Sequence, residues 1–139
     1  MAVQINIAYE GGLHSTATHG PSGRTVQTDA PLDNGGKGES FSATDLVATA
    51  LGSCMGTVMG LVANRHQLDI SGLQITVVKE MTADPVRRIG SLTTRLVFPA
   101  GKPLTAEQRA MLEAAARACP VKHSLHPDVK TPVEFVYPA

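Results

Sequence analysis

The two cysteines are the residues of this chain best suited to chemistry, because a thiolate can attack a substrate, bind a metal ion or pair with a second thiol. Cys54 lies in an apolar, uncharged segment at 46–63, and Cys119 follows an alanine-rich segment at 114–118. Two thiols in separate helical segments form a redox pair, belong to a metal site or pack as unrelated core residues. Which of these roles they have decides the function.

Histidines close to Cys119 in the sequence offer metal binding as the main rival to redox chemistry. Cys119, His123 and His126 would supply three ligands that zinc accepts, and Cys54 could add a fourth. Pro120 interrupts the helix that would align them, however, and no Cys-x-x-Cys pair accompanies them. The glycine-rich stretch at 35–38 also lacks the order of a phosphate-binding loop. We therefore expect no metal and no cofactor.

Length, composition and charge limit the domain size, the partners and the cellular compartment of the protein. The 139 residues, 42% of them hydrophobic, suffice for one domain spanning 1–139. Twelve basic residues balance twelve acidic ones, so neither nucleic acid nor a membrane surface is expected as a partner. The N-terminus lacks a basic stretch followed by an apolar one. We therefore expect a cytoplasmic protein, in which paired cysteines are more often redox-active or metal-binding than structural.

The element that must position Cys54 is a long helix. Ser42 and Asp45 have the spacing of a capping box, which predicts a helix from Ser42 to about His66. Segment 46–63 approaches the length of a membrane span, but its glycines and hydroxyl side chains favour a buried central helix. Glycines recur at every fourth position, which indicates close approach of another backbone or simply small residues in a crowded core. The glycines are Gly52, Gly56 and Gly60.

Alternating apolar residues predict strands before and after this helix, and a second capping box predicts the helix that leads to Cys119. Thr105 and Gln108 begin that helix, and Pro120 is expected to stop it just after Cys119. The predicted strands lie around 3–7, 13–19, 24–28, 70–82, 87–98 and 133–137.

Two motifs resemble the OsmC/Ohr superfamily. The first runs from Phe41 through Leu-Gly-Ser-Cys at Cys54, and the second is Cys-Pro-Val-Lys-His-Ser-Leu beginning at Cys119. The resemblance covers essentially the whole chain. It implies an α+β fold in which two sheets wrap around two central helices of an intertwined homodimer. It also implies cysteine-based reduction of hydroperoxides, in which Cys54 attacks and Cys119 resolves. As partners we expect a small hydroperoxide substrate and a dithiol reductant.

The chemistry of the two positions agrees with these roles. A thiolate that attacks a peroxide becomes a sulfenic acid, and a nearby thiol condenses with it to a disulfide. Cys119 is expected at the C-terminal end of its helix, where the negative pole of the dipole opposes ionisation, so Cys54 is the better attacking thiol. Cys54 lies about ten residues into its own helix, beyond the positive pole. A cation from elsewhere in the fold must therefore activate it.

The chain departs from the peroxidase members of the superfamily at one position. Those members resemble one another in an N-terminal arginine and in a glutamate ten residues before the first cysteine, where this chain has Thr44. The adjacent Asp45 is explained by its capping role. Arg24, which we expect in a strand, is the candidate for the activating arginine, with an exposed strand residue as the alternative. His123 is the next candidate.

A non-catalytic protein is the remaining alternative. The same pocket of a dimer could bind a small apolar ligand or sense redox state, with both cysteines acting as small hydrophobic residues. The homodimer itself is also expected from the central helix, which is apolar around its circumference and exceeds what two small sheets cover.

Overall fold

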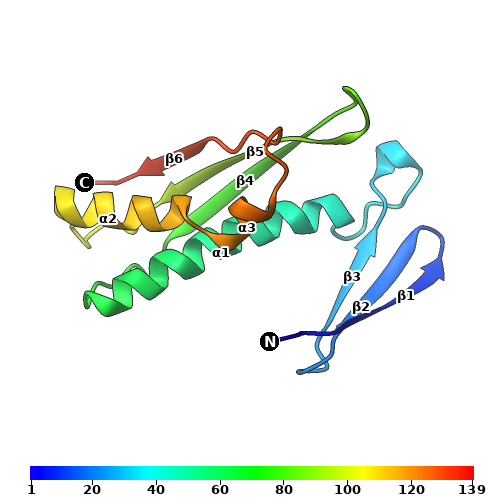
Figure 1. Cartoon of the computed structure of the whole chain (residues 1–139), viewed down its shortest axis with the longest axis horizontal. Helices are drawn as coiled ribbons and strands as arrows, with labels where there is room; N and C mark the ends of the chain where they lie inside the picture. The colour runs from blue at the N-terminus through cyan, green and yellow to red at the C-terminus, as the bar shows by residue number, and fades with distance from the viewer. The chain divides into compact units, whose positions relative to one another are not determined.

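A three-stranded antiparallel meander forms the N-terminal part of the chain (Figure 1). In this computed structural model, which describes residues 1–139, the chain divides into two compact units at 1–47 and 48–139. The first two strands are joined by a turn in which Gly11, Gly12 and Leu13 all have positive φ. The strands of the meander are β1 (Ile5–Gly11), β2 (His14–His19) and β3 (Thr25–Asp29).

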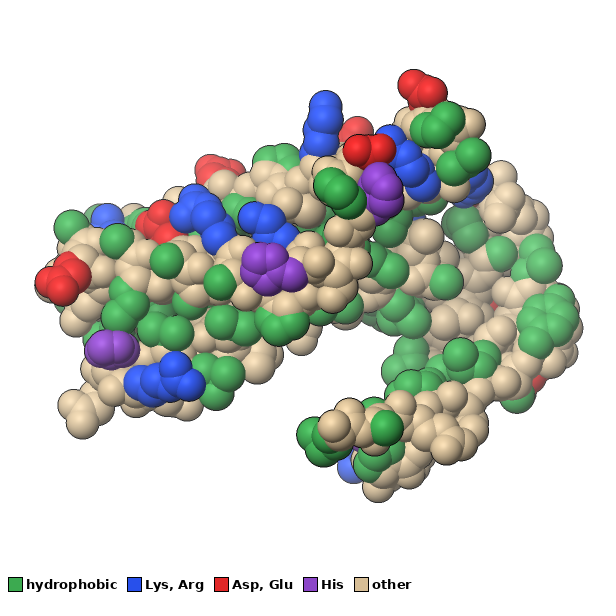
Figure 2. All heavy atoms as spheres, viewed as in Figure 1, with side chains coloured by type: hydrophobic (Ala, Val, Ile, Leu, Met, Phe, Trp, Pro, Cys, Tyr) green, Lys and Arg blue, Asp and Glu red, His purple; other side chains and the backbone are tan.

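One face of this meander is apolar and exposed. Ile5, Ile7 and Tyr9 alternate along β1, and Ile7 pairs with Ala17 of β2, which in turn pairs with Val26 of β3. Paired residues of neighbouring strands lie on the same face of a sheet. Ile7 is 68% exposed and Tyr9 is 65% exposed, and Figure 2 shows apolar side chains at the surface over these strands. Hydrophobic residues that form such a row are typical of a surface that another element covers.

The long helix α1 (Ala43–Arg65) begins as the sequence predicts. The Ser42 hydroxyl accepts a hydrogen bond from the Asp45 amide at 3.1 Å, and the Asp45 carboxylate accepts one from the Ser42 amide at 2.9 Å. This reciprocal pair satisfies two amide groups that have no partner within the helix. By length and composition alone α1 could cross a membrane, a test that the core helix of a soluble protein also passes.

The second unit places helices against one face of a three-stranded sheet, in the order β4-β5-β6 (Figure 1). β4 and β5 are antiparallel, whereas the last strand runs parallel to β5. Apolar residues on one side of β5 and on α1 and α2 form the core. The elements are β4 (Gln74–Thr82), β5 (Arg88–Val97), α2 (Ala106–Arg117), α3 (Pro120–Ser124) and β6 (Val133–Val136). The fully buried residues include Leu51, Met55, Met59, Leu92, Leu96 and Leu112.

The glycines of α1 explain how closely this helix packs on its own sheet. A Cβ atom added at Gly52 would lie 2.9 Å from the Val77 side chain, and one at Gly56 would lie 2.8 Å from Ile75. Both neighbours belong to β4, so the predicted close approach is to side chains of the same chain. Gly60 has no atom within 4 Å of such a Cβ.

Aromatic contacts fix the end of the chain to α2. The Tyr137 ring stacks on Phe98 with ring centroids 4.6 Å apart, and the Arg109 guanidinium lies 4.2 Å from the centre of the Tyr137 ring. The Tyr137 hydroxyl donates to the Glu113 carboxylate at 2.6 Å. These contacts anchor the segment after β6 to α2 and to Phe98, which follows β5.

The two long helices α1 and α2, the short α3 and two three-stranded sheets confirm the predicted α+β class. The predicted first helix and the strands agree with the structure to within a few residues. Two local predictions are wrong: α2 ends at Arg117, before Cys119, and Arg24 precedes β3 and so lies outside any strand. The single domain and the homodimer stay predictions.

Candidate active site

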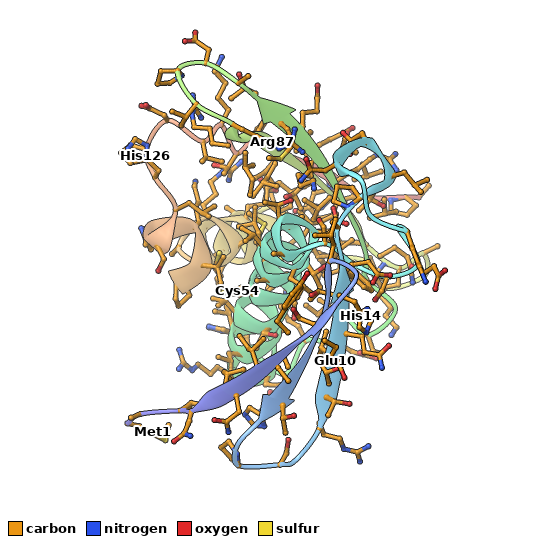
Figure 3. The ribbon with its side chains drawn as sticks, turned by 90° about the vertical axis from the view of Figure 1, so that its right-hand side faces the viewer. Met1, Glu10, His14, Cys54, Arg87 and His126 are labelled. Carbon is orange, nitrogen blue, oxygen red and sulfur yellow. The ribbon has the colours of Figure 1, made fainter.

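Cys54 lies in the middle of α1 on a partly exposed flank of the helix. Its neighbours Leu51 and Met55 are fully buried, whereas Cys54 is half-buried and Ser53 is exposed. Figure 3 shows Cys54 on the flank of α1 that is nearer α3. Cys54 therefore combines a fixed position on a rigid element with access for a small reactant.

Cys119 is fully buried and begins a helix, contrary to the prediction that it ends one. α2 closes at Arg117, and Cys119 is the N-cap of α3, with Pro120 in the first turn. The Cys119 sulfur accepts a hydrogen bond from the Lys122 amide at 3.4 Å. Proline is favoured at the first position of a helix, so Cys-Pro was the signal that could have revealed this start and the contact with Lys122.

The structure brings the two cysteines together. Burial raises the pKa of the Cys119 thiol, and the Lys122 amide opposes that shift. The nearby Cys54 side chain raises the pKa of Cys119 further. Both cysteines are free. Of the pair, Cys119 is therefore held in its protonated form next to Cys54.

Arg24 belongs to the first unit, in the turn between β2 and β3. Its carbonyl oxygen accepts from the His19 amide at 2.8 Å, and its own amide donates to the Ser22 hydroxyl at 3.2 Å. Both contacts involve the backbone of Arg24 and explain the turn, while the side chain is exposed. The activating role of Arg24 stays a prediction.

Thr44, which stands where the resemblance leads us to expect a glutamate, lies in the first turn of α1. The Thr44 hydroxyl is 3.3 Å from the Ser42 hydroxyl, and Asp45 completes the capping box described above. The capping role predicted for Asp45 is therefore confirmed.

The histidines do not assemble the rival metal site. No group of three or more His, Cys, Asp or Glu residues is arranged to hold a metal ion. The His123 amide donates to the Cys119 carbonyl at 3.3 Å, and the His126 ring accepts from the Asp128 amide at 3.0 Å. The first is a backbone bond within α3 and only the second involves a ring, so the two histidines share no arrangement that would hold a metal ion.

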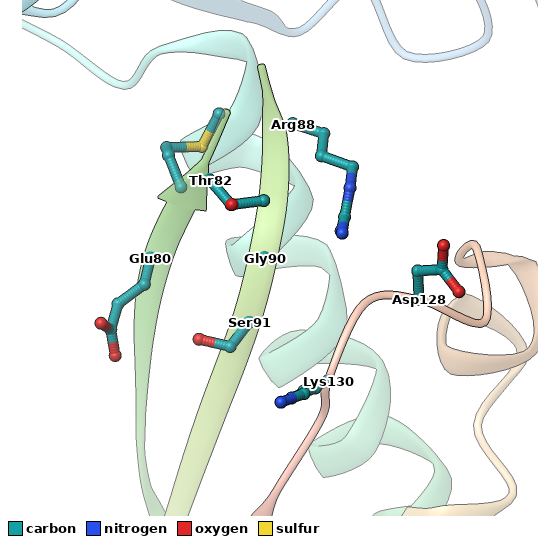
Figure 4. Close-up of a pocket in the computed structure, with 8 residues that line it drawn as sticks. Glu80, Thr82, Arg88, Gly90, Ser91, Asp128 and Lys130 are labelled. Atoms are coloured by element: carbon teal, nitrogen blue, oxygen red, sulfur yellow. The ribbon is translucent and has the colours of Figure 1, made fainter. Parts of the chain in front are cut away.

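A polar cavity of about 310 Å³ lies at the end of the β4–β5 pair (Figure 4). Charges of both signs line it, with Arg88 and Lys130 opposed by Glu80 and Asp128. None of the predicted site residues lines this cavity. It therefore adds nothing to the chemistry of the cysteine pair.

Comparisons with known proteins agree with this arrangement. A family model described as OsmC-like protein matches residues 36–134. A solved structure from Psychrobacter arcticus, provisionally named an osmotic stress induced and detoxification response protein, is 40% identical, with a TM-score of 0.88 over 94% of this chain and 93% of that one. Comparison with curated proteins gives no match.

More distant structures share the fold. An OsmC like protein from Mycoplasma pneumoniae has a TM-score of 0.81 at 14% identity, over 100% of this chain and 99% of that one. An organic hydroperoxide resistance protein OsmC from Legionella pneumophila has a TM-score of 0.78 at 15% identity, over 98% and 97% of the two chains. At 14–15% identity, such similarity shows that the fold is shared and says nothing about function.

Proposed function

The chain belongs to the OsmC-like protein family, and on that premise we propose that it reduces hydroperoxides, with Cys54 as the attacking thiol and Cys119 as the resolving thiol. The observation that carries the proposal is that Cys54 lies close enough to the buried Cys119 to help raise the pKa of its thiol. Several solved proteins of this fold are named organic hydroperoxide resistance proteins. Those names describe those proteins and support the choice of substrate class here.

The first step oxidises Cys54. The Cys54 thiolate attacks one peroxide oxygen, an S–O bond forms as the O–O bond breaks, and the alkoxide leaves as an alcohol after taking up a proton. A half-buried sulfur on α1 can be reached by a small peroxide. The product is a sulfenic acid on Cys54.

The second step uses Cys119, the thiol that lies near Cys54. The Cys119 sulfur attacks the sulfenic sulfur, an S–S bond forms, and the hydroxyl leaves as water with the proton that Cys119 releases. A dithiol reductant then restores both thiols and is itself oxidised to a disulfide. A Cys119 kept protonated does not compete with Cys54 for the peroxide, because the thiolate is the nucleophilic form.

We also propose a cellular location, an oligomeric state and an activating cation for Cys54. We place it in the cytoplasm as a homodimer, with Arg24 as the cation that stabilises the Cys54 thiolate. No bound cofactor is needed, because peroxide and dithiol supply both electron transfers.

Peroxide consumption tests the proposal. Wild-type protein, Cys54→Ser and Cys119→Ser are compared with cumene hydroperoxide and dithiothreitol, with Ser53→Ala as a matched control on the exposed side of α1. We expect turnover in the wild type and the control and none above background in Cys54→Ser. Without dithiothreitol, Cys119→Ser should consume one equivalent of peroxide and stop at the sulfenic acid. Equal consumption by wild type and Cys54→Ser would contradict the assignment, and no consumption by any variant would favour a ligand-binding protein.

A further inference from the structure

A charged cluster in the first unit has no part in the proposed cysteine chemistry. His14 lies on β2, the middle strand, between Glu10 at the end of β1 and Asp29 at the end of β3. Figure 3 shows Glu10 and His14 together near the β1–β2 turn. Nδ1 of His14 is 2.5 Å from Oδ1 of Asp29, and Nε2 is 3.6 Å from Oε1 of Glu10. One imidazole ring thus lies between two carboxylates from two different strands.

Each carboxylate is held in place by a further contact. Asp29 is only 7% exposed, and its second oxygen accepts the Glu39 amide at 3.0 Å. The Glu10 carboxylate accepts the Thr16 hydroxyl. The hydrogen bond with His14 is the largest of the influences that hold the pKa of Asp29 below its usual value. Asp29 is therefore ionised at neutral pH.

The protonation state of His14 decides whether both contacts are favourable. A neutral imidazole carries one N–H group, and the short contact to Asp29 assigns it to Nδ1. The lone pair on Nε2 then faces the Glu10 carboxylate, and two acceptors repel. A second proton gives Nε2 a donor and the ring a positive charge, so both carboxylates become partners.

Two other charged residues line the cavity beside the His14 ring. Lys37 and Glu39, both from the loop after β3, line a cavity of about 320 Å³ together with Glu10, His14 and Asp29. Lys37 opposes a positive charge on the ring, whereas the Glu39 carboxylate favours it. The surroundings of His14 thus hold three carboxylates against one ammonium.

We propose that His14 is a pH-operated clamp of the N-terminal sheet, which ties β1 to β2 and β3 when the ring is protonated and releases the end of β1 when the proton leaves. The contact with Asp29 persists in both states through Nδ1. The contact with Glu10 is present while the ring is protonated and is lost when the ring becomes neutral. At the acid limit the clamp also fails, when the pH falls far enough to protonate Asp29.

Amide hydrogen exchange in the full-length chain tests the clamp. Protection of the β1 amides is measured by NMR at pH 5.5 and 8.5, after correction for the intrinsic rate of exchange. We expect protection near Glu10 to fall about two- to fivefold at the higher pH, the scale of an exposed ion pair. His14→Gln keeps a donor for Asp29 but cannot become charged, so its corrected protection should not depend on pH.

Two further variants make the result decisive. Glu10→Gln removes the charge that only protonated His14 can use, and it should abolish the pH response of β1 while leaving Asp29 in contact with His14. His19→Gln is the matched control, because His19 lies on the same strand and its ring contacts only the Ser22 hydroxyl. The control should respond to pH like the wild type. A pH response that survives in His14→Gln or in Glu10→Gln would overturn the proposal.

Discussion

Cys119 is subject to opposing influences that set its reactivity. Burial and the neighbouring Cys54 raise its pKa, and the Lys122 amide opposes them. A raised pKa in the folded state means that the fold retains a proton that the unfolded thiol loses. This contribution to stability is complete below the ordinary thiol pKa and is lost as the pH rises through the raised value.

Selective alkylation should follow from this difference. We expect iodoacetamide at pH 7 to label Cys54 first, and Cys119 to become reactive only at alkaline pH or after unfolding. Mass spectrometry of peptides taken at successive times measures both rates. Equal labelling of the two cysteines at pH 7 would show that burial and the contact with Cys54 do not control Cys119.

The residue that activates Cys54 can be identified by its pH dependence. If Arg24 stabilises the thiolate, Arg24→Ala should slow peroxide reduction by about tenfold or more at every pH, because a guanidinium stays charged throughout. If His123 does so, its contribution should fade as the pH rises through the imidazole range. Rate profiles of wild type, Arg24→Ala and His123→Ala between pH 5 and 9 separate the two. Wild-type rates in Arg24→Ala would leave Arg24 as a turn residue.

At the scale of single elements, the packing of α1 on β4 depends on two glycines. Gly52→Ala places a methyl group 2.9 Å from the stiff, branched side chain of Val77, and overpacking of this kind costs about 1–3 kcal/mol. Gly60→Ala meets no atom and should stabilise the helix by roughly 0.5–1 kcal/mol. Urea denaturation of the two variants and the wild type gives both differences. A stabilised Gly52→Ala would mean that α1 can move away from the sheet without cost.

The elements also show what the sequence could and could not predict. Both capping boxes were readable, because a capping box is a local pattern in which each side chain serves the first turn of its own helix. The start of α3 was missed because Pro120 was interpreted only as a helix stop, although proline also favours the first turn. The parallel pairing of β6 with β5 depends on partners far away in the sequence, which a strand pattern does not specify.

The candidate site was predictable in its residue types and less so in its geometry. Cys54 and Cys119 stood out as the two thiols of the chain, and their placement on helices carried the functional hypothesis. Their proximity depends on packing between segments far apart in the sequence, and the position of Cys119 at the start of α3 reverses the dipole argument made from the sequence. Cys54 remains the better attacking thiol for a different reason, namely the burial of Cys119.

At the scale of the whole molecule, exposed apolar surface points to association. Ile5, Ile7 and Tyr9 on β1 and Val26 on β3 form an exposed apolar row within the N-terminal sheet. Contiguous apolar surface of this kind usually marks an interface. We propose a second copy of this chain as the partner, in line with the homodimer expected from the sequence.

Sedimentation velocity tests this proposal. We expect a dimer at micromolar concentration for the wild type and at least tenfold weaker association for Ile7→Lys, because an unpaired ammonium in an interface costs several kcal/mol. Val86→Lys is the control, since Val86 is similarly exposed at 62% but lies in the loop between β4 and β5. A monomeric wild type, or equal weakening by both variants, would contradict a dimer formed through β1.

The sulfur that caps α3 gives the protein a built-in spectroscopic reporter. The Lys122 amide donates to Cys119 Sγ, so any change in the bonding of that sulfur alters the magnetic environment of one backbone proton. We expect the Lys122 amide resonance to move when peroxide joins the two cysteines, and to return when a dithiol separates them. The oxidation state of the pair can thus be followed in intact protein, without chemical labels, from a single peak of the amide spectrum.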